Sequence, residues 1–192
     1  MKRWIVLCLV ILQIVLFSGC RSLSDDTPKN TQDGDKFATA LSYANWTEDF
    51  SIYFGALNND TFAISRTPHL PIYKFETPAE LDRFRDNFSD IFSMEHGMDE
   101  VPSFCETITA YDADFFEDNT LFLVYVGASN STHRFGLEQI YCDGTNFCLH
   151  LKETTGAECV DEAMAGWFLT VAVPKETVAG CTEFDADLNA LL

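Results

Sequence analysis

The apolar run near the N-terminus most constrains what this chain can fold into, because it separates the first residues from the rest. Lys2 and Arg3 precede 14 residues, Trp4–Phe17, that are apolar apart from Gln13. As a helix this run would be about 21 Å long, at ~1.5 Å per residue, whereas a membrane span needs about 20 apolar residues. A basic start, a short apolar run and small residues before a cysteine are typical of a secretory signal. The folded domain is therefore expected in the residues that follow.

The end of this run, Phe17-Ser18-Gly19-Cys20, resembles the signal of bacterial lipoproteins. The resemblance implies cleavage after residue 19 and acyl chains such as palmitate on Cys20, with diacylglycerol in thioether linkage. Phe17 stands where such signals usually carry Leu, and the alternative is an ordinary signal peptide with an incidental cysteine. Each buried methylene of an acyl chain contributes about 0.8 kcal/mol to membrane binding. We expect a lipid anchor at Cys20 on the extracytoplasmic side of the cell membrane.

Composition divides the remaining chain into a tether and one domain. Residues 20–36 are mostly polar and contain no aromatic side chain, which predicts a flexible, lipid-anchored tether. Residues 37–192 then form a single domain of about 155 residues, a normal size. Removal of the signal peptide, residues 1–19, deletes Lys2 and Arg3 and takes the net charge from −18 to −20. Such an acidic chain repels nucleic acid, so no nucleic-acid partner is expected.

Local patterns in the domain predict an α+β fold. Thr77-Pro78-Ala79-Glu80 is typical of a capped helix start, and apolar residues at helical spacing continue the helix over 78–92. One broken helix or two short ones are expected between Pro102 and Asn119. The predicted strands that share one antiparallel sheet are 121–126, 134–142, 147–153 and 167–173, with the helices on one face of that sheet. Shorter strands are expected at 62–65 and 70–75, a short helix near 50–57, and a tail at 188–192.

The mature chain has five further cysteines, namely Cys105, Cys142, Cys148, Cys159 and Cys181. Export permits disulfides, and an odd number leaves at least one thiol free or paired with another chain. If Gly144-Thr145-Asn146 is a three-residue loop, Cys142 and Cys148 lie directly opposite each other, with Cβ atoms about 4.5–5.5 Å apart. A Cys142–Cys148 disulfide is therefore a candidate, and two buried free thiols are the alternative.

Other residue clusters suggest no cofactor, metal or catalytic residue. The chain has no Cys-x-x-Cys pair, and its histidines (69, 96, 133 and 150) show no ligand spacing, which speaks against structural zinc. Four acids at 112, 114, 117 and 118 fit helix capping and dipole complementation better than calcium binding, because an EF-hand glycine and glutamate are missing. Ser129, Ser131 and His133 fit a polar turn better than a nucleophile and base, because no nucleophile-elbow sequence surrounds them.

Three segments resemble known proteins. Residues 69–75 (HLPIYKF), 111–126 (YDADFFEDNTLFLVYV) and 160–174, with DEAMAGWF at 161–168, resemble a group of uncharacterised Firmicutes lipoproteins. Residues 121–175 also resemble the C-terminal domain of PrcB, a subunit of a spirochaete protease complex. These relatives often carry Ser-Gly-Ser after the central strand, where this chain has Ser-Asn-Ser at 129–131. The resemblance implies a surface-anchored accessory or binding protein, and it supplies no catalytic residue.

The functional hypothesis is a lipid-anchored extracytoplasmic accessory or binding protein that acts through protein–protein contact and is not an enzyme. Its partners would be the membrane, through the lipid on Cys20, and another extracytoplasmic protein. The alternatives are a secreted hydrolase with an unrecognised site and a structural envelope lipoprotein. A pocket of polar side chains with perturbed pKa values would favour the hydrolase. A broad exposed aromatic patch would favour the binding protein.

Overall fold

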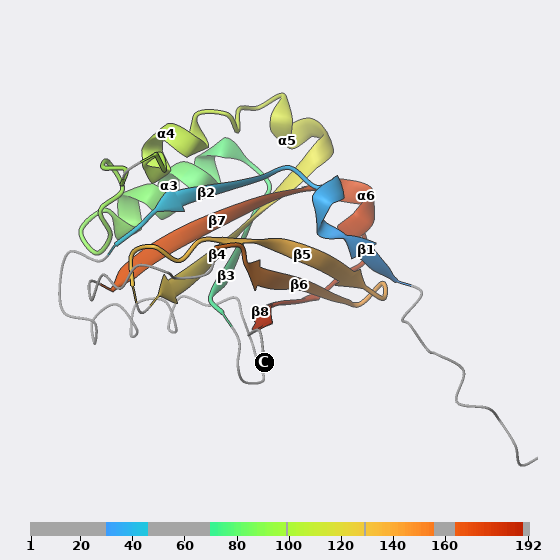
Figure 1. Ribbon diagram of the computed structural model, residues 1–192. Coiled ribbons are helices and arrows are strands. Elements are labelled where there is room, and N and C mark those ends of the chain that lie inside the picture. Colours follow the sequence, from blue (N-terminus) through green and yellow to red (C-terminus); the bar gives the residue numbers. More distant parts are fainter. Residues whose placement is uncertain (1–29, 46–69, 99, 129, 156–163, 190–192) are drawn as a thin grey trace, which may run out of the picture.

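The computed structural model describes residues 30–45, 70–98, 100–128, 130–155 and 164–189, which form an α+β domain (Figure 1). Cys20, Ser129, Cys159 and the elements expected at 50–57 and 62–65 lie outside these residues. The elements, in chain order, are β1 (Thr31–Asp33), η1 (Gly34–Lys36), β2 (Thr39–Tyr43), β3 (Ile72–Phe75), α3 (Pro78–Phe88), α4 (Phe104–Ile108), α5 (Phe115–Asp118), β4 (Asn119–Ala128), β5 (Phe135–Cys142), β6 (Asn146–Glu153), β7 (Ala165–Pro174), α6 (Lys175–Val178) and β8 (Glu183–Asn189). No helix among the described residues is long and apolar enough to cross a membrane.

The described strands form two four-stranded sheets. The central sheet has the order β2-β7-β4-β3 and is antiparallel throughout. The hairpin sheet has the order β1-β5-β6-β8, and its edge strand β8 runs parallel to β6. Helices α3, α4 and α5 lie on one side of the central sheet and the hairpin sheet lies on the other (Figure 1). The domain therefore has three layers, with the central sheet in the middle.

Two hydrophobic cores fill the spaces between these layers. The core between the sheets includes Phe122, Val124 and Val126 of β4, Trp167, Leu169 and Val171 of β7, and Phe147, Leu149 and Leu151 of β6. The core under the helices includes Leu121, Leu123 and Tyr125 of β4, Phe168 of β7, and Leu81, Phe84, Phe88, Phe104 and Ile108 of the helices. Successive strand residues point to opposite faces. A strand covered on both faces must therefore be apolar at every position, which explains the continuous apolar run over 121–126.

Helix α3 begins as the sequence predicts. The side chain of Thr77 accepts a hydrogen bond from the Glu80 main-chain nitrogen (3.3 Å), and the Glu80 carboxylate accepts one from the Thr77 nitrogen (3.2 Å). These two bonds satisfy main-chain donors that the first helical turn leaves unpaired. Leu81, Phe84 and Phe88 are buried against the central sheet, as expected. The helix ends at Phe88, four residues before the predicted end.

The prediction of one shared antiparallel sheet is wrong. The strands at 119–128 and 165–174 lie in the central sheet, whereas those at 135–142 and 146–153 lie in the hairpin sheet. The α+β class and the helices on one face of a sheet are confirmed. The error has a physical cause, because an apolar strand face has the same pattern whether a helix or a second sheet covers it.

The predicted tether is also too long at its C-terminal end. Residues 31–33 form β1, in register with residues 139–141 of β5, and residues 34–36 form the turn η1. Gly34 is buried there, and a Cβ at this position would lie 2.6 Å from the main-chain oxygen of Leu137. Residues 31–36 therefore belong to the folded domain. Strand β2, which pairs with β7, was not among the predicted strands either.

Gly166 of β7 lies unusually close to neighbouring parts of the chain. Gly166 of β7 lies opposite Gly127 of β4. A Cβ on Gly166 would lie 2.1 Å from the Tyr125 hydroxyl and 2.6 Å from the Ala44 oxygen, whereas the nearest atom to a Cβ on Gly127 would be 3.9 Å away. Packing alone therefore requires glycine at 166, just before the buried Trp167.

Candidate metal centre

Strand β6 presents two different faces. Phe147, Leu149 and Leu151 are buried in the core between the sheets. Cys148 and His150 alternate with them and are only partly buried. Because strand residues two apart share a face, Cys148 and His150 lie side by side on the face of the hairpin sheet that points away from the core.

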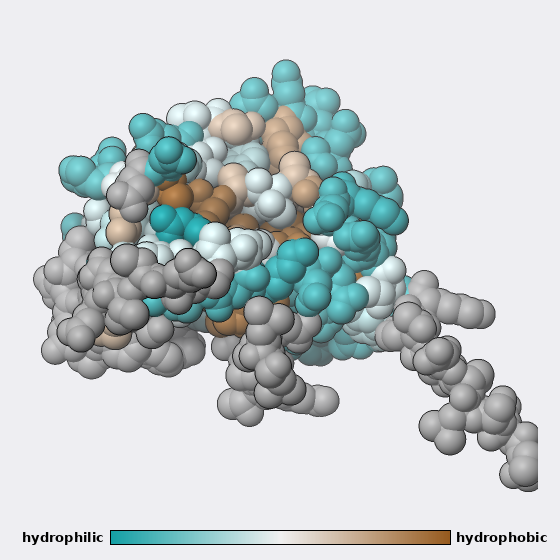
Figure 2. All heavy atoms as spheres, in the orientation of Figure 1, coloured by the Kyte–Doolittle hydropathy of each residue, from teal (hydrophilic) through white to brown (hydrophobic). Residues whose placement is uncertain are grey.

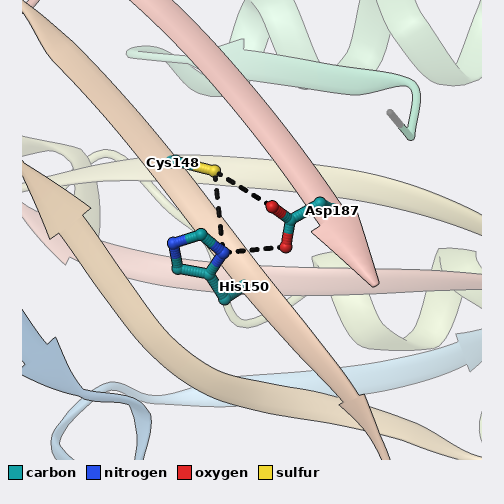
Figure 3. A group of neighbouring side chains, drawn as sticks. All are labelled: Cys148, His150 and Asp187. Carbon is teal, nitrogen blue, oxygen red and sulfur yellow. Dashed lines mark hydrogen bonds and ion pairs between the residues drawn. The ribbon is translucent and has the colours of Figure 1, made fainter. Parts of the chain in front are cut away.

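Strand β8 supplies a third donor to this face. It pairs with β6 in parallel, with Asp185 opposite Cys148 and Asp187 opposite His150. The Asp187 carboxylate lies 2.8 Å from His150 Nδ1 and 3.9 Å from Cys148 Sγ, and this Sγ lies 4.0 Å from the same Nδ1 (Figure 3). The three donor atoms lie within 4.8 Å of one another, and no second group of this kind occurs in the described ranges.

The surroundings of this cluster are negative and half-buried. The side chains of His150 and Asp187 are 25% and 29% exposed, so the cluster is open to small solutes. Burial, and then the charges of Asp187 and Asp185, raise the pKa of the Cys148 thiol to about 12. Cations are therefore attracted to the cluster, and without one the sulfur carries a proton.

The three side chains are not arranged as a nucleophile relay. In a Cys-His-Asp relay the nucleophile and the carboxylate contact opposite nitrogens of the imidazole ring. Here Cys148 and Asp187 both contact Nδ1 of His150. Nucleophilic cysteines also have a lowered thiol pKa, whereas burial and carboxylates raise that of Cys148. A sulfur, a nitrogen and an oxygen within 4.8 Å of one another are instead a set of atoms that can ligate a metal ion.

The predicted Cys142–Cys148 disulfide is wrong. The main-chain nitrogen of Asp143 donates to the oxygen of Asn146 (3.1 Å), which leaves Gly144 and Thr145 as a two-residue turn. The register is therefore shifted by one residue from the expected one, and Cys142 lies opposite Phe147 rather than Cys148. A shift of one residue moves a side chain to the other face of the sheet.

The turn that sets this register is held by Asp143. Its carboxylate accepts hydrogen bonds from the main-chain nitrogens of Thr145 (2.9 Å) and Asn146 (2.7 Å) and from the Asn146 side chain (2.8 Å). These bonds hold the pKa of Asp143 well below its usual range. Gly144 adopts φ 91°, a left-handed conformation that costs glycine little. The shorter turn is therefore specified by Asp143 and Gly144 together.

Cys142 instead faces Cys181, which follows α6. Their sulfur atoms lie 3.2 Å apart, and Cys142 Sγ also donates to the Thr177 oxygen (3.3 Å). All four described cysteines, including Cys105, are free thiols. Burial and the hydrogen bond with Cys142 raise the pKa of Cys181 to about 11. The cysteines of the hairpin therefore belong to two different clusters, on opposite faces of the sheet.

The remaining residue clusters of the sequence have local structural roles. Asp112 accepts a hydrogen bond from the Phe115 nitrogen (2.9 Å) at the start of α5, as the capping interpretation expects, whereas Asp114 makes no such bond. His133 Nδ1 contacts the Glu153 carboxylate at the far end of the hairpin. Ser131 accepts a hydrogen bond from Arg134 at its main-chain oxygen. Among the described residues, none of these contacts forms a group of possible metal ligands like that of Cys148, His150 and Asp187.

No family model, curated protein or solved structure significantly matches this chain. The resemblance to Firmicutes lipoproteins and to PrcB therefore stays a prediction. The lipid site at Cys20 lies outside the described residues and also stays a prediction.

The surface offers no broad aromatic patch within the described residues. Met164 is the single large hydrophobic side chain classed as exposed there, at 56%. In the view of Figure 2, hydrophilic residues surround the hydrophobic ones that show in the middle of the described surface. A broad exposed aromatic patch, the feature that would favour a binding protein, is therefore not found among the described residues.

The Cys148 cluster escapes prediction from the sequence for two reasons. The familiar spacings of metal ligands are Cys-x-x-Cys and pairs of nearby histidines, and this chain has neither. Cys-x-His on a strand also places two donors on one face. From the sequence, no strand is predicted at β8 and a tail is predicted at 188–192. The prediction of a tail is wrong for residues 188 and 189, which belong to β8. The alternation of Phe184, Ala186 and Leu188 with acidic residues is a strand pattern that identifies β8.

Proposed function

We propose that this protein is a lipid-anchored, extracytoplasmic binding protein, with its domain held close to the membrane. The observation that carries the proposal is the basic start, apolar run and Gly19-Cys20 at the N-terminus. Cys20 and Thr31, the first residue of β1, are 11 residues apart in the sequence. A chain of that length spans at most about 40 Å when fully extended. The anchor therefore keeps the domain within this distance of the bilayer surface.

Charge keeps the domain beside the membrane rather than on it. The mature chain carries a net charge of −20 after loss of Lys2 and Arg3 from the total of −18. Anionic headgroups repel such a surface, so attachment depends on the lipid and not on electrostatic adsorption. The partner of such a domain is a second extracytoplasmic protein or a small cation that complements the negative surface.

The anchor is tested by the variant Cys20→Ala, with Cys8→Ala as the matched control inside the apolar run. Both variants and the wild type are expressed with a radiolabelled palmitate precursor in a bacterium that processes lipoproteins. The wild type and Cys8→Ala should incorporate the label and pellet with membranes, whereas Cys20→Ala should lack the label. A labelled, processed and membrane-bound Cys20→Ala protein would contradict the anchor.

The protein–protein part of the proposal has its own test. The wild-type protein is purified through an affinity tag from detergent-solubilised membranes of its own host, with Cys20→Ala processed in parallel. A protein that co-purifies with the wild type in a fixed stoichiometry supports an accessory role. Recovery of the wild-type protein alone would contradict that role and leave the anchor unaffected.

A further inference from the structure

We propose that Cys148, His150 and Asp187 form a binding site for a divalent transition-metal ion of the zinc class. The inference goes beyond the proposed function, because it uses no part of the anchor and names a ligand that the anchor does not imply. It depends on one thiol, one imidazole and one carboxylate that the pairing of β6 with β8 brings together.

The spacing of the three donor atoms fits tetrahedral coordination. Bonds of about 2.3 Å to sulfur and about 2.0–2.1 Å to nitrogen and oxygen place neighbouring ligand atoms about 3.3–3.6 Å apart. In the structure Cys148 Sγ lies 4.0 Å from His150 Nδ1 and 3.9 Å from an Asp187 oxygen. The nitrogen and the other Asp187 oxygen are 2.8 Å apart. One ligand atom from each residue lies within 4.8 Å of the others, so movements of no more than about 1.5 Å, within reach of side-chain rotation, complete the geometry.

The types of ligand select the metal. A thiolate disfavours Mg²⁺ and Ca²⁺, which prefer oxygen ligands. Sulfur, imidazole and carboxylate together suit Zn²⁺ and its tetrahedral analogue Co²⁺. Three protein ligands leave a fourth position, which water or a donor from another molecule fills.

The sheet holds the ligands in place. Cys148 and His150 lie on β6, whose residues Phe147 and Leu149 are buried in the core between the sheets. Ala186, next to Asp187 on β8, is fully buried as well. The two strands are therefore locked in register by packing on the inner face, and the ligands on the outer face need little ordering before they bind an ion.

A neighbouring charge favours a cation. Asp185 pairs with Cys148 across the two strands, and its carboxylate accepts a hydrogen bond from the Ala186 nitrogen (2.8 Å). With Asp187 it places two carboxylates beside the sulfur. The negative charge of these two carboxylates attracts a divalent cation and strengthens its binding.

The test is zinc binding by the full-length protein, purified in detergent, reduced and freed of metal. Calorimetry should give one Zn²⁺ per chain, and Co²⁺ should give thiolate-to-cobalt charge-transfer absorption. Cys148→Ser, His150→Gln and Asp187→Asn should each weaken zinc binding by at least about tenfold, the loss seen even for residues that only support a ligand. Circular dichroism of each metal-free variant checks that it folds.

Two control variants separate this site from zinc binding elsewhere on the chain. Cys142→Ser removes a thiol of the other cluster, and Glu183→Gln removes an exposed charge from β8. Both should bind zinc like the wild type. Wild-type affinity in Cys148→Ser or Asp187→Asn would overturn the proposal, as would loss of zinc in Cys142→Ser or equal weakening by Glu183→Gln and Asp187→Asn.

The proposed metal site and the proposed lipid anchor can be tested independently of each other. Cys20→Ala should lose the lipid label and keep zinc affinity, whereas Asp187→Asn should keep the label and lose affinity. Zinc should also raise the melting temperature of the wild type and not that of Asp187→Asn, because only a ligand that binds the folded state stabilises it. An equal rise in both proteins would contradict the assignment of Asp187.

Discussion

Oxidation should join Cys142 to Cys181 and stabilise the domain. Their sulfur atoms lie 3.2 Å apart, about 1.2 Å more than a disulfide bond. An oxidant such as glutathione disulfide accepts two electrons and two protons from the two thiols, forming one disulfide and two glutathione molecules. The closed loop contains about 40 residues, which by loop entropy stabilises the fold by about 4 kcal/mol before any strain. For a domain of this size that corresponds to about 8–15 °C in melting temperature.

The assay compares oxidised and reduced full-length protein by thermal melting, with peptide mapping of a non-reduced digest. The wild type and Cys148→Ser should melt higher when oxidised, because both retain the Cys142–Cys181 pair. Cys142→Ser should show no such gain. The map should link the peptides that contain Cys142 and Cys181.

Three results would refute this reasoning. Full alkylation of both cysteines after oxidation would show that the sulfur atoms do not approach each other. A Cys142–Cys148 link would show that the hairpin has the register expected from the sequence rather than the observed one. A gain of the same size in Cys142→Ser would assign the stabilisation to another pair.

The core and the caps give further predictions, each measured by denaturant unfolding. Phe84→Asp should lose more than about 3 kcal/mol, because it places an unpaired charge in the core under the helices, whereas the exposed Asn87→Asp should change stability by less than about 0.5 kcal/mol; equal stability of the two would disprove the helix face. Gly166→Ala should cost at least about 2 kcal/mol and Gly127→Ala less than about 0.5 kcal/mol, because only the Cβ at 166 would clash with its neighbours; a neutral Gly166→Ala would contradict the close approach. Thr77→Ala should cost about 1 kcal/mol through loss of the cap, and an unchanged midpoint would argue against the capping box.

Local features of the domain could be predicted because their causes are local. The capping box and the apolar stripe of α3 lie within a few turns of one helix, so the residues buried by α3 follow from spacing alone. The run over 121–126 is apolar at every position, which indicates a strand buried on both faces. The division into two sheets does not follow, because β4 places apolar side chains in both cores and its pattern does not distinguish a covering helix from a covering sheet.

The candidate metal centre shows, at the scale of single residues, that local sequence patterns do not determine which strands lie side by side. By itself the sequence determined the apolar run that precedes Cys20, the helix α3, the central strand and the existence of the hairpin. Only the tertiary structure decided the hairpin register, because a turn shorter by one residue places Cys142 and Cys148 on opposite faces of a strand whose side chains alternate. Only the tertiary structure brought Asp187 to His150, because a parallel pairing between strands 37 residues apart leaves no mark on the local pattern of either strand.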